Sequence, residues 1–256
     1  MDLGLKDRVY VVTGGTRGLG RAAAEALVAD GARVVVSSRD TDSVRNAAAS
    51  LGGRGVAVGV VADNADPATP DLLLSTARAS FGRIDGTLIS VGGPPTGPVS
   101  AITDEQWLAA FSSVFLGAVR MARVFAAALA ETADGGAIAF VLSQSVRQPI
   151  PNLATSNGLR PGLAMVAKTL ADEYGPHGVR VLGLLPGRLA TDRLLEMDGA
   201  TGDAVAARAK ASEAIPLRRY GEPPEFGAVA AFLLSPAASY LTGLMVPVDG
   251  GAIRSL

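Results

Sequence analysis

Short apolar runs rich in β-branched residues alternate along the chain with longer segments in which alanine and leucine recur at helical spacing. Continuous apolar runs are typical of strands buried on both faces of a sheet, and Ala/Leu-rich amphipathic segments are typical of the helices that cover it. The runs predict strands at 8–13, 33–37, 56–61, 86–91, 137–142, 179–185 and 244–248. The segments between them predict helices at 19–29, 42–51, 68–80, 103–130 and about 154–174.

This alternation predicts the fold class. Strands joined through helices lie parallel, so we expect an α/β, doubly wound Rossmann fold of about seven parallel strands with helices on both faces. The 256 residues show no interdomain linker, which favours a single domain over 1–256. The irregular stretch 187–214 is long enough to form a lid over a site at the edge of the sheet.

Helix-breaking glycine and proline residues lie near the start of one predicted helix. Gly158, Pro161 and Gly162 fall within 154–174, and an interior proline removes a hydrogen bond and presses on the carbonyl of Asn157, at about 3 kcal/mol. We therefore expect this helix either to kink here or to begin later.

Composition excludes several classes of function. A net charge of −1 gives no general attraction to nucleic acid or anionic membranes. The chain has no cysteine and one histidine, so a Cys- or His-ligated metal is not expected. His177 precedes a strand, which predicts a surface loop at the edge opposite the site. The N-terminus lacks signal-peptide features and no apolar run reaches membrane-spanning length, so we expect a cytoplasmic protein.

A glycine-rich turn follows the first predicted strand and opens the first helix. Glycines there let the backbone approach a phosphate, and the helix N-terminus offers unpaired N–H groups. The same glycines would also serve a tight strand-to-helix turn for steric reasons alone, but their place in the first βα unit favours dinucleotide binding.

The spacing Gly14-x-x-x-Gly18-x-Gly20 resembles the first turn of the short-chain dehydrogenase/reductase (SDR) family, T-G-x-x-x-G-x-G. Asp63 after the third strand, P-G-R-L-A-T at 186–191 and two C-terminal segments, PLRRYGEPPEF and TGLMVPVDGG, extend the resemblance over essentially the whole chain. It implies a site at the carboxyl edge of the sheet. The cofactor contacts it implies are Gly14, Thr16, Arg17, Gly18, Leu19, Gly20, Ser38, Arg39, Asp63, Asn64, Gly92, Gly93, Pro186, Gly187 and Thr191.

Charge at the end of the second strand predicts NADP(H) as the cofactor. An NAD-specific protein places an acidic residue there to accept a ribose hydroxyl, whereas this chain has Ser38 followed by Arg39. Arg17 in the glycine-rich turn lies on the same side, so the two arginines would clamp a 2′-phosphate. The alternative is that both are ordinary solvated surface residues.

The resemblance breaks where catalysis is expected. Ser143 matches the family's catalytic serine, but Ser156 stands at the position of its tyrosine and Arg160 at that of its lysine. Val114 replaces the helix asparagine, and of the fourth-strand motif N-N-A-G only Gly93 remains. The chain is similar to a divergent, β-ketoacyl-reductase-like subgroup.

These substitutions limit the available chemistry. A serine hydroxyl is far less acidic than a phenol, and an arginine stays protonated, so it stabilises an oxyanion or binds a carboxylate but relays no proton. Loss of a positioned general acid costs about 10²–10⁴ in rate unless water, the substrate or the polar loop 143–148 supplies the proton. Gln144, Arg147 and Arg188 are candidate substrate contacts at strand ends.

Three hypotheses remain open. The first is an NADP(H)-dependent oxidoreductase in which Ser143 and Ser156 orient the oxygen and Arg160 stabilises its charge. The second is a non-redox enzyme, a dehydratase, isomerase or cyclase, and the third is a non-catalytic NADP-binding protein in which Ser156 and Arg160 are relics. Alanine-rich faces at 118–130 and 164–171, helices that the family pairs across subunits, predict a homo-oligomer, a tetramer.

Overall fold

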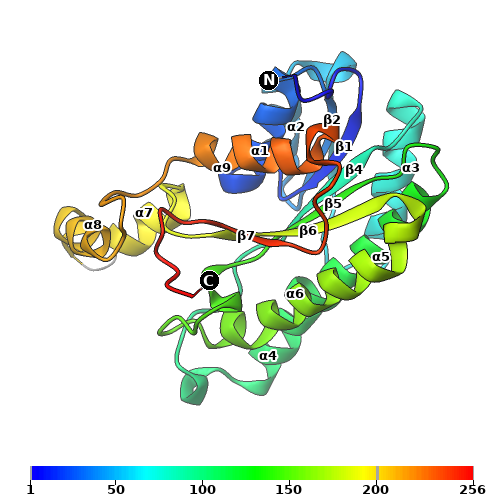
Figure 1. The fold of residues 1–256 in the computed structure, drawn as a ribbon. Helices are drawn as coiled ribbons and strands as arrows, with labels where there is room; N and C mark the ends of the chain where they lie inside the picture. The colour runs from blue at the N-terminus through cyan, green and yellow to red at the C-terminus, as the bar shows by residue number, and fades with distance from the viewer. Residues whose placement is uncertain (1, 200–201, 256) are drawn as a thin grey trace.

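The sheet at the centre of the protein has seven parallel strands in the order β3-β2-β1-β4-β5-β6-β7 (Figure 1). The computed structural model describes residues 2–199 and 202–255. The strands are β1 (Val9–Thr13), β2 (Arg33–Ser38), β3 (Ala57–Val61), β4 (Gly86–Ser90), β5 (Gly136–Val141), β6 (Val179–Pro186) and β7 (Met245–Val248). The predicted doubly wound fold is confirmed. Strand order reverses between β1 and β4, where ligands bind in such sheets.

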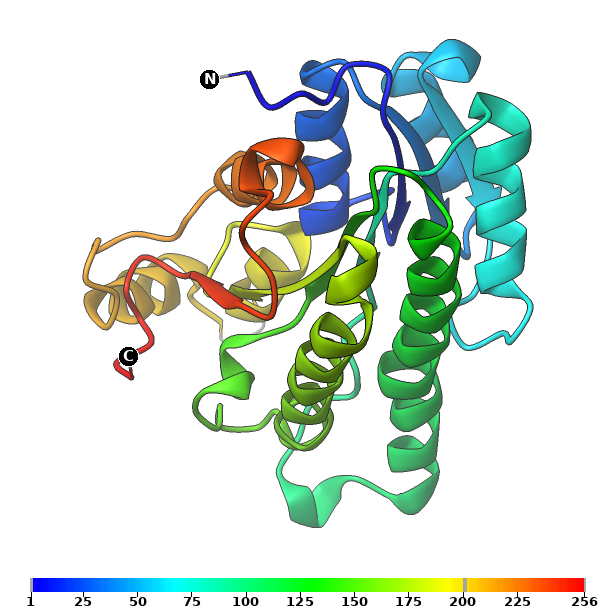
Figure 2. The same cartoon turned by 45° about the vertical axis from the view of Figure 1, so that its right-hand side comes forward.

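Helices cover both faces of the sheet because successive residues of each strand point to opposite sides. Val9 and Val11 of β1 pack with α3, α5 and α6, whereas Tyr10 and Val12 pack with α1, α2 and α9. In Figure 2, α3, α5 and α6 lie side by side on one face. The α-helices are α1 (Gly18–Ala29), α2 (Thr41–Ser50), α3 (Thr69–Phe81), α4 (Asp104–Ala110), α5 (Gly117–Ala130), α6 (Ala154–Tyr174), α7 (Asp192–Gly199), α8 (Ala204–Glu213) and α9 (Pro223–Leu234).

The predicted long helix 103–130 consists of α4, a π-helical turn, η3 (Phe111–Leu116), and α5. Thr103 and Gln106 form the capping box at its start. Contrary to the sequence-based expectation, 104–130 is long and apolar enough to cross a membrane by length and composition. Half of its most apolar window is buried, and Met121, Phe125 and Leu129 lie in the core, as in the core helix of a soluble protein.

Helix α6 runs from Ala154 to Tyr174 with Pro161 inside it, so of the two expected alternatives the later start is wrong. Tertiary packing explains why. A Cβ atom on Gly158 would lie 2.9 Å from the Trp107 ring, and one on Gly162 would lie 2.9 Å from the Phe115 ring. The two glycines thus let aromatic rings of α4 and η3 pack directly on the α6 backbone, which offsets the cost of the proline.

The segment 187–214 is also more regular than predicted, because it contains α7 and α8; residues 200 and 201 lie outside the described residues. His177 is exposed just before β6, at the edge opposite the carboxyl ends of the strands, as predicted.

The argument from alanine-rich faces is wrong. Most alanines of 118–130 and 164–171 are buried against the chain's own sheet. The exposed apolar side chains of these helices are instead Leu108, Phe111 and Met165.

Candidate active site at the carboxyl edge of the sheet

The glycine-rich turn is shaped by close backbone contacts. Gly14 has φ +60°, and a Cβ atom on Gly20 would lie 2.4 Å from the carbonyl oxygen of Gly14, so α1 can start directly against the turn only with glycine there. Arg17 precedes α1 without a side-chain cap, which leaves the first N–H groups of the helix open to an anion.

Segments distant in sequence meet at this turn. Thr13 Oγ1 donates to the Ser90 carbonyl at 2.8 Å and accepts from the Ser90 N–H at 2.9 Å, which ties the end of β1 to that of β4. The predicted segment 186–191 lies alongside: the Thr191 side chain is 3.7 Å from where a Cβ of Gly18 would be. Gly187, after Pro186, donates its N–H to Val248 at 3.0 Å.

Arg17 and Arg39 are both exposed, and neither side chain has a hydrogen bond or ion pair to any described residue. Ser38 is partly buried at the end of β2. The nearby carboxylate of Asp40 caps α2, where hydrogen bonds from Ser43 lower its pKa. The two guanidinium groups therefore remain available to an anionic ligand.

The predicted adenine side lies at the end of β3. Asp63 is exposed, and its Oδ1 accepts the N–H of Ala65 at 2.9 Å. Asn64 Nδ2 donates to the Ser90 carbonyl at 3.4 Å, which links this loop to β4. Of the glycines after β4, Gly92 faces open space and Gly93 is covered by another side chain.

Three serines form the polar part of the predicted catalytic centre. Ser143 Oγ accepts the N–H of Ser145 at 3.1 Å, and the hydroxyls of Ser145 and Ser156 lie 3.1 Å apart. Both Ser145 and Ser156 are buried. The structure thus brings Ser143 and Ser156 to one place through Ser145, which the sequence marked only as part of a polar loop.

Arg160 is buried one turn after Ser156 on α6, and its Nη1 donates to the carbonyl of Val141 at 2.8 Å. Burial, followed by the charge of Arg193, lowers the pKa of Arg160 to about 10. The guanidinium of Arg193 reaches from α7 over Gly93, where a Cβ atom would lie 1.0 Å from its Nη1. Sequence reasoning missed Arg193; its only signal was its place two residues after Thr191.

The three candidate substrate contacts do not converge. Gln144 Nε2 donates to Asp249 at 3.2 Å and lies against Gly187, so it holds the C-terminal segment in place. Arg147 is exposed. Arg188 donates to the Tyr220 hydroxyl at 3.0 Å and pairs with Asp198 at 3.4 Å, on the α7 side.

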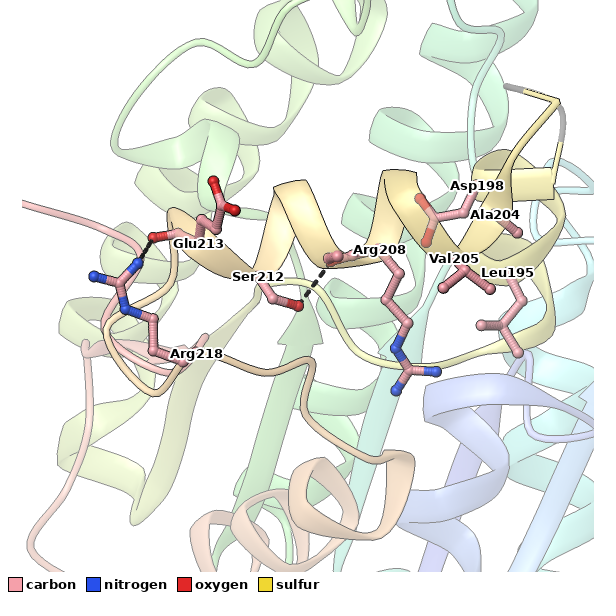
Figure 3. Close-up of a pocket in the computed structure, with 9 residues that line it drawn as sticks. Leu195, Asp198, Ala204, Val205, Arg208, Ser212, Glu213 and Arg218 are labelled. Carbon is pink, nitrogen blue, oxygen red and sulfur yellow. Dashed lines mark hydrogen bonds between the residues drawn. The ribbon is translucent and has the colours of Figure 1, made fainter.

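An open cavity of about 620 Å³ lies within the predicted lid segment (Figure 3). Leu195 of α7 and Val205 of α8 supply apolar wall, with Arg208, Glu213 and Arg218 at its margins. None of the predicted cofactor or catalytic residues lines it. Among the described residues, no three histidine or acidic side chains gather as ligands for a metal.

A family model described as enoyl-(acyl carrier protein) reductase matches residues 14–252. The chain belongs to the short-chain dehydrogenase/reductase family. Dehydrogenase/reductase SDR family member 4 of Homo sapiens is 33% identical over 251 residues, covering 96% of this chain and 88% of the human protein. L-rhamnose 1-dehydrogenase (NAD(P)(+)) of Azotobacter vinelandii is 32% identical, covering 98% of this chain and 99% of that protein.

Solved SDR structures share the whole fold. L-sorbose reductase from Gluconobacter frateurii, in complex with NADPH and L-sorbose, superposes with a TM-score of 0.94 at 29% identity, covering 100% of both chains. The family and its fold support a nicotinamide cofactor for this oxidoreductase. The turn fits one: Gly14 and Gly20 bring the backbone close, and the open N-terminus of α1 suits a pyrophosphate.

Proposed function

We propose that this SDR protein is an NADP(H)-dependent oxidoreductase that interconverts a carbonyl compound and its alcohol. The observation that carries the cofactor choice is the pair Arg17 and Arg39, exposed and without partners among the described residues, beside Ser38 where NAD-specific proteins carry an acid. A 2′-phosphate offers both guanidinium groups a charge-assisted bidentate partner.

The chemistry rests on the serine cluster and Arg160. When bound, the cofactor supplies or accepts the hydride. Ser143 and Ser156 orient the reacting oxygen, Ser145 holds Ser156 in place, and Arg160 stabilises negative charge that develops on the oxygen. Arg160 keeps its proton at neutral pH because its pKa, about 10, lies well above it. The proton that completes the alcohol therefore comes from a group other than Arg160: water, the substrate or the polar loop 143–148.

The relatives named for L-rhamnose and L-sorbose make hydroxylated carbonyl compounds and alcohols the first substrates to test. In the parent protein we expect NADPH to bind more tightly than NADH, and Arg39→Asp to reverse or abolish that preference. Fluorescence titration with both cofactors measures it, with Arg54→Asp, an exposed arginine outside the site, as the control. Equal affinities in the parent would contradict the cofactor assignment.

A non-redox reaction is the second candidate. Arg160 can polarise a carbonyl without relaying a proton, and Ser156 stands where the family has its proton-donating tyrosine. Single-turnover absorbance with a panel of carbonyl compounds separates the two. Oxidation of NADPH supports the oxidoreductase. Conversion of a compound without oxidation supports a dehydratase, isomerase or cyclase, and cofactor binding with neither supports a non-catalytic protein.

We also propose that the chain forms a homo-oligomer, a tetramer, through α4, η3 and α6. Leu108 and Met165 are 67% and 68% exposed there, and the Phe111 ring, stacked on Phe115, is 41% exposed. Large apolar side chains gathered on adjoining helices favour a partner surface. The protein's place in the cytoplasm, inferred from its sequence, is likewise a proposal.

A further inference from the structure

Two buried arginines of this chain differ in how their charge is satisfied. Arg180, on β6, donates to the carbonyl oxygens of Leu233, Ser235 and Leu241 at 2.7, 2.9 and 3.4 Å. Arg160 is 7% exposed but has one hydrogen bond, to Val141. A buried guanidinium has five N–H donors to satisfy, so Arg160 retains most of its hydrogen-bonding capacity.

The unused nitrogens of Arg160 reach a space open to solvent. Its Nε and Nη2 have no bonded partner among the described residues. They are also not sealed in, since the one fully buried side-chain polar atom without a partner in the described chain is Oγ1 of Thr87. These donors therefore retain some contact with solvent.

Arg193 converges on the same place from another element. Val141, which accepts the hydrogen bond from Arg160, is paired in the sheet with Ser90, and the loop after Ser90 carries Gly93 beneath the Arg193 guanidinium. The side chain of Arg193 has no hydrogen bond or ion pair to any described residue. The two cations thus meet at the ends of adjacent strands, β4 and β5.

No carboxylate of the described chain compensates this pair. The one charged group that affects Arg160 is Arg193, which disfavours its protonated form. Two neighbouring cations, one of them buried, are costly without an anion. An anionic ligand that accepts hydrogen bonds from both would remove that cost.

We propose that Arg160 and Arg193 form a carboxylate-binding subsite, and that the substrate is a 2-oxo acid or the corresponding 2-hydroxy acid. This inference rests on the proposed oxidoreductase function. Arg160 lies one turn from Ser156, so a carboxylate held by the two arginines places the adjacent carbon beside the serine hydroxyls. The planar guanidinium fork matches a carboxylate.

The phosphates of the cofactor have other partners. In our proposal Arg17 and Arg39 bind the 2′-phosphate, and the open N-terminus of α1 binds the pyrophosphate. The Arg160–Arg193 subsite lies instead beside the serine cluster. Because Arg160 lies one turn from Ser156, we assign that anion to the substrate.

Calorimetric binding of oxalate tests this inference without turnover. Oxalate is a small planar dianion, and oxamide is its neutral counterpart of the same shape. Both are titrated at pH 7.5 into the wild-type protein, Arg160→Met, Arg160→Lys and Arg193→Met, with and without NADP⁺. Arg54→Met controls for the loss of a surface charge. Arg193 is exposed, so its variant keeps the test valid if Arg160→Met fails to fold.

We expect oxalate to bind the wild-type protein at least tenfold more tightly than oxamide. Arg160→Met and Arg193→Met should each lower the affinity for oxalate by roughly tenfold or more, because charge-assisted hydrogen bonds are lost. Arg160→Lys should keep part of the affinity, and the affinity for NADP⁺ should change less than threefold in every variant. Arg54→Met should match the wild type.

Two results would overturn the subsite: equal binding of oxalate and oxamide, or unchanged oxalate binding in both Met variants. A tenfold loss of NADP⁺ affinity in Arg193→Met with unchanged oxalate binding would assign that arginine to the cofactor. The proposed oxidoreductase function is tested separately by the absorbance assay. If oxalate binding depends on the two arginines but no carbonyl compound oxidises NADPH, the subsite is supported and the oxidoreductase assignment is contradicted.

Discussion

Arg160 and Arg180 are both arginines with lowered pKa values, but their guanidinium groups differ in how many hydrogen bonds they make. Burial lowers the pKa of both guanidinium groups, and the charge of Arg193 adds to the effect on Arg160. The unfolded chain therefore holds these protons more tightly than the folded one. The resulting destabilisation is present throughout neutral pH, and for Arg160 it is relieved only as pH rises through about 10.

We predict opposite effects of removing the two charges. Arg160→Met should raise the thermal midpoint by about 2–4 °C, on the order of 1 kcal/mol, because an undercompensated buried cation is replaced by an apolar chain. Arg180→Met should lower the midpoint, because Arg180 satisfies three carbonyl groups. Differential scanning calorimetry without ligand measures both. A lower midpoint in Arg160→Met would mean that its charge is compensated in the folded protein.

At the scale of elements, α6 depends on the absence of two side chains. We predict that Gly158→Ala destabilises the protein by about 1–3 kcal/mol, because the added Cβ would lie 2.9 Å from the Trp107 ring and outweigh the gain in helix propensity. Gly175→Ala, at the C-terminal end of α6 with helical backbone angles and open space, is the matched control and should be neutral or slightly stabilising. Urea unfolding distinguishes them. Equal stability of the two variants would show that Trp107 moves freely.

The same element explains why restoring a tyrosine should not restore a reductase. Ser156 is 5% exposed and packs against Ser145, and Val114 supplies no polar group from the π-helical turn. We predict that the double variant Ser156→Tyr, Arg160→Lys remains an inefficient ketoreductase, measured as kcat/KM with NADPH over the carbonyl panel. Turnover typical of an SDR enzyme would show that these two positions alone determine the chemistry.

At the scale of the whole molecule, we propose that the exposed apolar residues of α4, η3 and α6 mediate assembly. We predict a tetrameric mass in light scattering at micromolar concentration, and a lower mass for Leu108→Glu with Met165→Glu, since charge in an apolar interface is costly. Val205→Glu, at an 81% exposed position on α8, is the control and should keep the parent mass. A monomeric parent would contradict the prediction.

Periodicity in the sequence sufficed to predict the sheet and the helices before residue 175, because burial on both faces demands continuous apolar strands, but it predicted no helix at α9. It also predicted the bounds of α6, where the alternative of a later start was wrong because packing by Trp107 and Phe115, residues of other elements, outweighs the local cost of Pro161. The pattern predicts an irregular segment at 187–214, because α8 carries little apolar periodicity and α7 has only eight residues. Local rules cannot include packing partners that are distant in the chain.

The sequence by itself predicted where a nucleotide would bind, since the steric demands of Gly14, Gly18 and Gly20 are local, and its resemblance to the family predicted Ser143, Ser156 and Arg160 as site residues. Only the tertiary structure decided which hydrogen-bond partners and neighbours the side chains of those residues have. It placed Ser145 between two predicted serines and carried Arg193 from α7 over Gly93. The physical reason is that side-chain contacts between separate elements depend on how whole helices pack on the sheet, which no spacing along one segment encodes.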